Sequence, residues 1–179
     1  MTHSRIVLVT GARQMGKSTL CQRVAETLRA AEVTVSGLLT RRTGPHDLVV
    51  SEMHTGNIYP LTLPYQGAGD PATPAFCMDP AAMARSAAAL ESAFPTQVFF
   101  LDELGPLELR RGAGWSNALP LLHTAQYKLA ILVIRPELLD VLIARLPAPP
   151  SAVFPVQPDN REQLFEALLQ QASCFDCMK

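Results

Sequence analysis

The residues whose types and spacing could do chemistry begin at Gly11. Residues 11–18 read Gly-Ala-Arg-Gln-Met-Gly-Lys-Ser, which fits the pattern G-x-x-x-x-G-K-[ST]. Glycines allow backbone angles that a Cβ would prevent, and successive N–H groups of such a loop converge on phosphate at the positive end of the next helix. The sequence therefore predicts a triphosphate-binding loop in which Lys17 contacts the β- and γ-phosphates and Ser18 ligates Mg²⁺. The alternative is a plain turn whose lysine faces solvent.

A second candidate group lies at residues 98–103, Val-Phe-Phe-Leu-Asp-Glu, where four apolar residues run into two carboxylates. A Mg²⁺–triphosphate site needs an acidic group opposite the loop serine, so that the water shell of the metal is held from two sides. Asp102 is the candidate for this role. Glu103 would point to the other side of the strand end, where it could orient a water in line with the γ-phosphate. Alternatively, Asp102 could cap free N–H groups of the following segment.

Alternating strand and helix patterns must position these groups. Short apolar or β-branched runs predict strands, and apolar residues at helical spacing predict helices. Strands are expected at residues 6–10, 33–40, 98–101, 129–134 and 152–155, and helices at residues 17–31, 81–94, 115–125, 136–146 and after Asp159. Residues 47–62 predict a hairpin with its turn at residues 55–57, and the proline-rich residues 60–80 predict mostly loop.

This alternation predicts an α/β fold, a P-loop NTPase three-layer sandwich with a mainly parallel sheet and an inserted β-hairpin. Residues 1–179 are expected to form a single P-loop NTPase domain, with the hairpin and proline-rich insertion at about residues 44–80. Ligands bind beyond the carboxyl ends of such strands. The chemistry is therefore expected just after Thr10 and just after Leu101.

Composition narrows the function classes. The chain has 179 residues, is 48% hydrophobic and 17% charged, and carries a net charge of −1. The absence of a basic excess argues against nucleic-acid binding through a broad surface. No apolar run reaches the length of a membrane span, so a cytoplasmic protein without a membrane partner is expected. The four cysteines are expected to be free thiols, and no second pair completes a zinc site with Cys174 and Cys177.

Residues 100–109, Phe-Leu-Asp-Glu-Leu-Gly-Pro-Leu-Glu-Leu, closely resemble the "DEIG-x-MEL" signature of a nucleoside-triphosphatase family first described from a thermophile, some of whose members are called nucleotide kinases. Residues 36–40 resemble the "GF-x-T" strand of that family, and residues 54–57 resemble its "TG" hairpin turn. Trp115 stands where an aromatic follows the acidic signature, and residues 160–161 resemble the "NR" that opens the last helix. The resemblance covers nearly the whole chain.

The resemblance implies Mg²⁺-dependent hydrolysis of ATP, GTP and other nucleoside triphosphates to diphosphate and phosphate, with loose base selectivity. It implies nucleotide contacts from residues 11–18 and 98–105. Lys17 and Glu103 are the expected catalytic residues, and Ser18 and Asp102 the expected metal ligands. The full set expected to contact the nucleotide is Gly11, Ala12, Arg13, Gln14, Met15, Gly16, Lys17, Ser18, Thr19, Asp102, Glu103 and Gly105.

Two positions of the loop depart from the family, which usually has glycine at Gln14 and threonine at Ser18. An arginine near the γ-phosphate would assist the reaction. Arg110 or Arg111 is slightly favoured for this role, and the other candidates are Arg13, Arg41, Arg42, Arg135 and Arg145. Asn160 and Arg161 are expected either to contact the base or simply to begin a helix.

Two other functions fit the same motifs. A small-molecule or nucleotide kinase would use the proline-rich loop or the hairpin as a lid over an acceptor. A nucleotide-dependent adaptor would bind nucleotide, turn over slowly and require a protein partner that the sequence does not identify.

Overall fold

The computed structural model describes residues 4–69 and 73–173. Within these residues the main sheet has seven strands: β1 Arg5–Thr10, β2 Val35–Arg42, β3 Leu48–Glu52, β4 Ile58–Pro60, β7 Thr96–Leu104, β8 Tyr127–Ile134 and β9 Ala152–Pro155. Their order across the sheet is β4-β3-β2-β7-β8-β1-β9. The strands from β2 to β9 in this order are parallel, and β3 and β4 extend the sheet antiparallel as a hairpin. The expected α/β fold with an inserted hairpin is confirmed.

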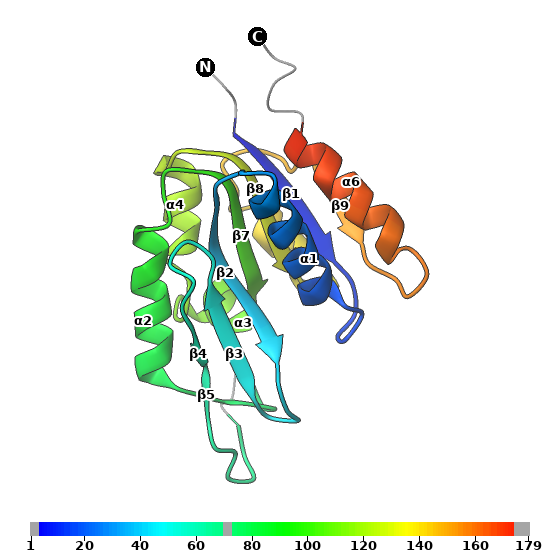
Figure 1. Cartoon of the computed structure of the whole chain (residues 1–179). Helices are drawn as coiled ribbons and strands as arrows, with labels where there is room; N and C mark the ends of the chain where they lie inside the picture. Colours follow the sequence, from blue (N-terminus) through cyan, green and yellow to red (C-terminus); the bar gives the residue numbers. More distant parts are fainter. Residues whose placement is uncertain (1–3, 70–72, 174–179) are drawn as a thin grey trace.

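Helices cover both faces of this sheet (Figure 1). They are α1 Lys17–Ala30, α2 Pro80–Glu91, α3 Pro106–Arg111, α4 Ala118–Thr124, α5 Leu139–Ile143 and α6 Arg161–Ser173, with a short 3₁₀ turn, η1 Pro136–Leu138, before α5. α1 and α6 lie side by side on one face, and the cluster that includes α2 and α4 covers the other. The helix expected over residues 136–146 is therefore a 3₁₀ turn followed by a shorter α-helix.

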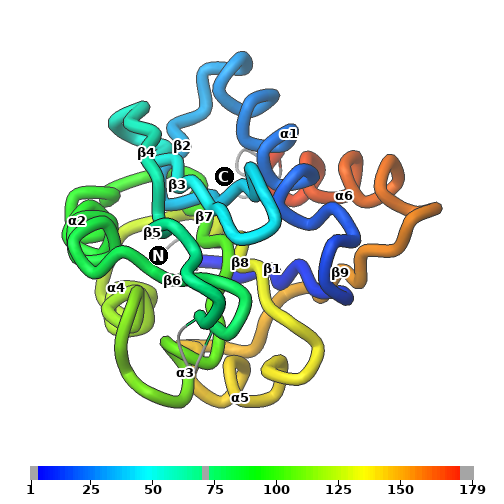
Figure 2. The backbone as a smooth tube through the Cα atoms, turned by 90° about the horizontal axis from the view of Figure 1, so that it is seen from below, coloured from blue at the N-terminus to red at the C-terminus, as the bar shows by residue number. Residues whose placement is uncertain are grey.

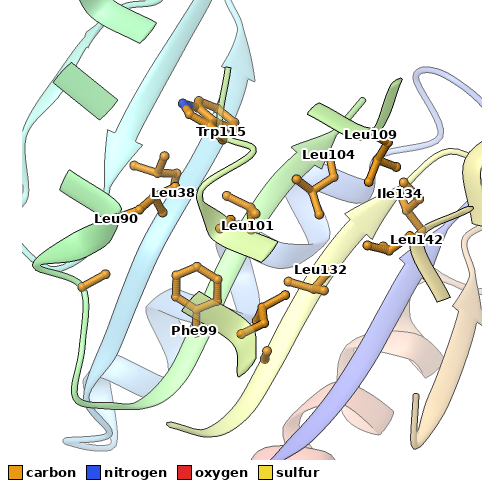
Figure 3. Close-up of a cluster of buried hydrophobic side chains, with 14 of the residues drawn as sticks. Leu38, Leu90, Phe99, Leu101, Leu104, Leu109, Trp115, Leu132, Ile134 and Leu142 are labelled. Carbon is orange, nitrogen blue, oxygen red and sulfur yellow. The ribbon is translucent and has the colours of Figure 1, made fainter. Parts of the chain in front are cut away.

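The side chains of β1 show why the central strands are continuous apolar runs in the sequence. Ile6 and Leu8 pack into the core on the α2 face, whereas Val7 and Val9 pack into the core on the α1 face. Because a strand presents alternate side chains to opposite faces, a strand covered on both sides must be apolar throughout. Figure 3 shows the core on the α2 face, where Trp115 closes one end.

The segment between β4 and α2 contains structure that the sequence did not predict. Two short strands, β5 Thr62–Leu63 and β6 Cys77–Met78, pair antiparallel as a second sheet. The ring of His46 stacks on Tyr65 at 3.8 Å between centroids and ties this sheet to the β2–β3 turn. In Figure 1 the arrowheads of β1 and β7 point toward the side of the molecule on which β5 lies, and Figure 2, seen from that side, shows β5 and β6 on the β7 side of the sheet. The insertion therefore borders the edge where chemistry is expected.

The short helix α3 was also not predicted. Gly105 occupies its N-cap and Pro106 its first position, a favourable start for a helix. The Glu108 side chain accepts a hydrogen bond from the Gly105 N–H at 2.8 Å and from the Trp115 N–H at 3.3 Å. Glu108 thus fixes the turn that follows β7, and burial raises its pKa while these N–H groups oppose the rise.

Gly37 allows β2 and β7 to pair closely. Its φ is +100°, and a Cβ added there would lie 1.9 Å from the carbonyl oxygen of Phe100. No side-chain rotation can relieve a clash between a Cβ and backbone. The close pairing matters for function because β7 carries both candidate carboxylates.

We expect the substitution Gly37→Ala to lower the free energy of unfolding by about 3 kcal/mol or more, because β2 must separate from β7. Urea denaturation followed by circular dichroism measures this. Gly56→Ala is the matched control: Gly56 also has positive φ, +78°, but no atom lies within 4 Å of the added Cβ. Its expected loss is only about 1 kcal/mol. Equal losses at the two positions would contradict the argument from close approach.

Candidate active site

The loop between β1 and α1 has the conformation that the glycines were expected to permit. Gly11 has φ +139° and Gly16 has φ +90°. A Cβ on Gly11 would lie 2.7 Å from the carbonyl oxygen of Val156, and one on Gly16 would lie 3.2 Å from Nη1 of Arg161. Gly11 is thus needed because the loop packs closely against the backbone after β9, and Gly16 is needed chiefly for its positive φ, since the Arg161 side chain beside it could move.

Gln14 stands where the resembling family usually has glycine, and its φ of +63° is left-handed. A residue with a Cβ pays roughly 1–2 kcal/mol for this conformation. The loop nevertheless continues into the helix, where the N–H of Leu20 bonds to the carbonyl of Gly16 at 2.9 Å. The departure therefore strains the backbone locally without displacing the start of α1.

Lys17 lies over the loop and does not face solvent. Its residue exposure is only 6%, and Nζ donates hydrogen bonds to the carbonyl oxygens of Gly11 at 2.7 Å and Ala12 at 2.8 Å. This excludes the alternative of a solvated lysine in a plain turn. A phosphate oxygen would be a stronger partner for the ammonium than a neutral carbonyl, because both groups would then be charged.

Asp102 meets the loop at the end of β7. The residue is 1% exposed, and its Oδ2 accepts hydrogen bonds from the hydroxyl of Thr40 at 3.2 Å and, more weakly, from the Thr40 N–H at 3.4 Å. The Ser18 hydroxyl is close enough to this carboxylate to lower its pKa. Burial raises the pKa of Asp102 to about 6, the charge of Glu103 adds to the rise, and Ser18 and Thr40 oppose it. These partners differ from those of a helix cap, and Glu108 supplies the side-chain contact at the start of α3.

The pair Ser18 and Asp102 fits a small divalent cation. The partners of the Asp102 carboxylate are neutral hydroxyl and amide groups, so its negative charge is left in a dry environment. Mg²⁺ favours such oxygen ligands and commonly takes one or two from the protein, with the rest from phosphate and water. Within residues 4–69 and 73–173 no cluster of three or more His, Cys, Asp or Glu side chains could hold a metal alone.

Lys17 and Asp102 lie on the same side of the sheet. Cys21, in the first part of α1, is completely buried, and its pKa is raised first by burial and then by the charge of Asp102, while Lys17 lowers it. Both charged groups therefore act on one thiol. The strand β8 separates β1 from β7, and the parallel strands bring their carboxyl ends to one edge.

Glu103 forms an ion pair with Nε of Arg135, the first residue after β8. Both side chains are partly buried, with 26% of Glu103 and 19% of Arg135 exposed. Arg110 and Arg111, the arginines that the sequence slightly favoured, are exposed in the last turn of α3. Asp102 was predicted at the site because parallel strands end at the same edge of the sheet. The same argument applies to Arg135, because it directly follows β8.

The other residues predicted to contact the nucleotide differ in how exposed they are. Ala12 and Arg13 are exposed in the loop, Met15 packs partly against the core, and Thr19 is exposed at the start of α1. Gly105 is buried and its N–H is already bonded to Glu108. Its backbone N–H is therefore not available to a nucleotide in this conformation.

A cavity of about 310 Å³ lies beside the loop, between α1 and the start of α6. An ion pair between Arg23 and Glu162, 3.0 Å apart, forms part of its wall. Arg161 lines the cavity, whereas Asn160 fixes the preceding turn by accepting from the Gln157 N–H and donating to the Pro155 carbonyl, each at 2.9 Å. The "NR" pair thus divides into one residue that faces a possible ligand and one that shapes the turn.

Some expectations from composition can also be compared with the structure. Cys21 and Cys77 are free thiols, and Cys174 and Cys177 lie outside the described residues. No helix in the described part of the chain is both long enough and apolar enough to cross a bilayer.

Comparisons with known proteins agree with this geometry. A family model described as NTPase matches residues 6–47, which include the loop. The nucleoside-triphosphatase THEP1 of Pyrococcus abyssi (strain GE5 / Orsay) is 28% identical over 169 residues, 91% of this chain and 89% of that protein. The crystal structure of THEP1 from the hyperthermophile Aquifex aeolicus shares the fold, with a TM-score of 0.70 over 92% of this chain and 97% of that one at 16% identity. The chain therefore shares the mainly parallel α/β fold of the Aquifex aeolicus protein, and the region around its phosphate-loop pattern is similar to the NTPase family model.

Proposed function

We propose that this protein hydrolyses nucleoside 5'-triphosphates to diphosphate and phosphate. The observation that carries the proposal is the buried carboxylate of Asp102, held by Thr40 at the carboxyl end of β7, at the same edge of the sheet as Lys17 and the phosphate loop. The similarity to a protein named nucleoside-triphosphatase supports it. Such an arrangement provides a cation, backbone N–H groups and oxygen ligands for a metal at one edge of the sheet.

Each residue of the loop has a role in binding the substrate. The backbone N–H groups of residues 11–18 would surround the β-phosphate, and Lys17 would exchange the carbonyls of Gly11 and Ala12 for β- and γ-phosphate oxygens. Ser18 and Asp102 would hold Mg²⁺, which when bound neutralises charge on the β- and γ-phosphate oxygens. Burial excludes water from around Asp102, which strengthens these electrostatic interactions.

The role of Glu103 is to orient and deprotonate the attacking water. A bond forms between the water oxygen and the γ-phosphorus, and the bond from that phosphorus to the bridging oxygen breaks. The diphosphate leaves with the bridging oxygen, and the proton of the water passes to Glu103. Catalysis of this kind depends mainly on positioning and on neutralising the charge that spreads over the γ-phosphate.

The cavity beside the loop is a candidate site for the base. Its lining includes charged and polar residues such as Arg23, Glu162 and Thr19, and the guanidinium of Arg161 offers a planar surface. Stacking on a planar guanidinium does not depend on which base is bound, which is consistent with use of ATP, GTP and other triphosphates. A cytoplasmic location and the absence of a nucleic-acid partner stay predictions from the sequence.

A kinase is the second candidate, because the β5–β6 insertion borders the same edge of the sheet as the loop (Figure 2). The deciding experiment incubates the protein with Mg²⁺ and labelled ATP, GTP, CTP or UTP, with and without candidate nucleosides and nucleotides, and identifies the products. Diphosphate with free phosphate supports the hydrolase. A labelled acceptor supports the kinase, and nucleotide binding without either product supports the adaptor.

Lys17→Ala should reduce phosphate release by about 10³-fold or more, because the γ-phosphate loses its cation in the transition state. A coupled phosphate assay at saturating ATP and Mg²⁺ measures the rate. Lys128→Ala is the control, since Lys128 is exposed near the start of β8, at the opposite end of that strand from Arg135. A Lys17→Ala protein that keeps the wild-type rate would contradict the proposed role.

Asp102→Asn should stabilise the ligand-free protein at pH 7.5 by about 1–3 kcal/mol, while removing the Mg²⁺-dependent phosphate release. The pKa of Asp102 is raised from 3.8 to about 6, so the folded protein binds this proton more tightly than the unfolded chain does. Its contribution to the free energy of unfolding therefore falls as pH rises from about 4 to about 6. The free energy of unfolding of the wild type minus that of Asp102→Asn, measured by denaturation between pH 4.5 and 7.5, should fall in the same way as pH rises. A constant difference would show that the carboxylate is not destabilised by burial.

A further inference from the structure

Arg135 stands between the two halves of the candidate site. It directly follows β8, which lies between β1, the strand that leads into the phosphate loop, and β7, the strand that carries Asp102 and Glu103. Its backbone is extended, and its carbonyl accepts the N–H of Leu138 at 3.0 Å, which closes the η1 turn. The side chain therefore starts from a defined backbone position at the same edge as the loop.

The guanidinium of Arg135 is only partly engaged. Its Nε donates to Oε1 of Glu103, and Nη2 lies 4.0 Å from the position that a Cβ on Gly105 would occupy. In the described part of the chain, the hydrogen bond to Glu103 is the contact that orients the guanidinium. An arginine has five N–H donors, so the four N–H groups on the terminal nitrogens remain for a ligand.

The contact with Glu103 also constrains the carboxylate. Oε1 receives the Nε–H of Arg135, and Oε2 is left to accept a proton from water. Because the guanidinium is planar, a bond at Nε fixes the direction in which the terminal nitrogens point. A general base and a cation are thus held side by side as one unit.

Building on the hydrolysis proposed above, we propose that Arg135 is a catalytic residue that binds the γ-phosphate through its terminal nitrogens while its Nε holds Glu103. The water that Glu103 deprotonates then lies between the carboxylate and the phosphorus that it attacks. As negative charge spreads over the γ-phosphate oxygens, the guanidinium neutralises it. Arg135 therefore recognises the third phosphate and has no role in binding a diphosphate.

Arg42, a second arginine near this edge, is less suited. Arg42 donates to the carbonyls of Gly44 and Pro45 and lies over the ring of Phe76, at 5.1 Å from its centroid. Its guanidinium is thus committed to the β2–β3 turn. Arg29 is exposed in the last turn of α1, at the end of that helix away from the phosphate loop, which makes it a matched control for loss of a positive charge.

The test compares Arg135→Ala, Arg135→Lys and Arg29→Ala in two measurements on the full chain. In single-turnover phosphate release with ATP and Mg²⁺, Arg135→Ala should be slower by about 10²–10³-fold, and Arg135→Lys should recover little of the loss because it lacks the Nε–H and the fork. Added guanidinium chloride at millimolar concentration should restore part of the Arg135→Ala rate. Arg29→Ala should match the wild type and show no such rescue.

The second measurement is calorimetric affinity for ADP and for a non-hydrolysable ATP analogue. Arg135→Ala should weaken the affinity for the analogue by about tenfold and leave the affinity for ADP unchanged. A tenfold loss corresponds to about 1.4 kcal/mol, which is reasonable for one ionic contact to phosphate. The same selective loss should appear in the background Glu103→Gln, because the contact with phosphate does not act only through Glu103.

The proposal is overturned if Arg135→Ala keeps the wild-type rate, or if ADP and the analogue weaken equally, which would indicate a structural role. If Arg135→Ala does not fold, Arg135→Lys carries the same comparison of the two ligands. Absence of phosphate release by the wild-type protein would reject the proposed hydrolysis but would not reject the contact between Arg135 and the third phosphate. The two affinities would still decide whether Arg135 recognises the third phosphate.

Discussion

The buried carboxylate of Asp102 joins the parts of the molecule that the site requires. It lies in β7, accepts hydrogen bonds from Thr40 in β2, and meets the hydroxyl of Ser18 at the start of α1. One side chain of β7 thus connects to α1 and β2, two consecutive elements that lie far from β7 in the sequence. The arrangement opposes stability in the ligand-free protein, because burial raises the pKa of Asp102 and disfavours its charged form. A cation at this position would relieve that penalty, so the feature that weakens the fold is the one that prepares the site.

The sheet determines which other residues can reach this carboxylate. Parallel strands bring their carboxyl ends to one edge, and the order β7-β8-β1 places the residue after β8 between the phosphate loop and the two acids. The register of β7 against β8 shifts between Leu101 and Leu104, around the two acids. Asp102 remains buried while Glu103 is partly exposed and pairs with Arg135. One strand end therefore presents two carboxylates to different environments, which suits one to a metal and the other to water.

Local patterns in the sequence predicted much of the fold and of the candidate site. The features that these patterns missed depend on contacts between residues far apart in the chain. The loop and the strands were predictable because glycine spacing and apolar runs report local backbone preferences. The hairpin was likewise marked by its turn at residues 55–57. The pairing of β5 with β6 could not be predicted from local patterns, because it depends on contacts such as the His46–Tyr65 stack. The helix α3 is too short for an apolar period to reveal, and the Glu103–Arg135 pair joins residues 32 positions apart.

Many of the residues that carry the family resemblance shape the chain and have no direct part in chemistry. Gly37 allows β2 to approach β7, and Trp115 donates from its indole to the buried hydroxyl of Ser86 at 2.8 Å. In the hairpin, Glu52 accepts hydrogen bonds from the side chains of Thr55, Asn57 and Tyr59. Burial raises the pKa of Glu52, but these bonds together with Arg85 lower it below its ordinary value, so the cluster is stable as a charged group. Such residues preserve the geometry of the edge while the residues that touch a substrate can change. A shared signature of this kind therefore specifies the edge of the sheet at which phosphate chemistry can occur more tightly than it specifies which molecule receives the phosphate.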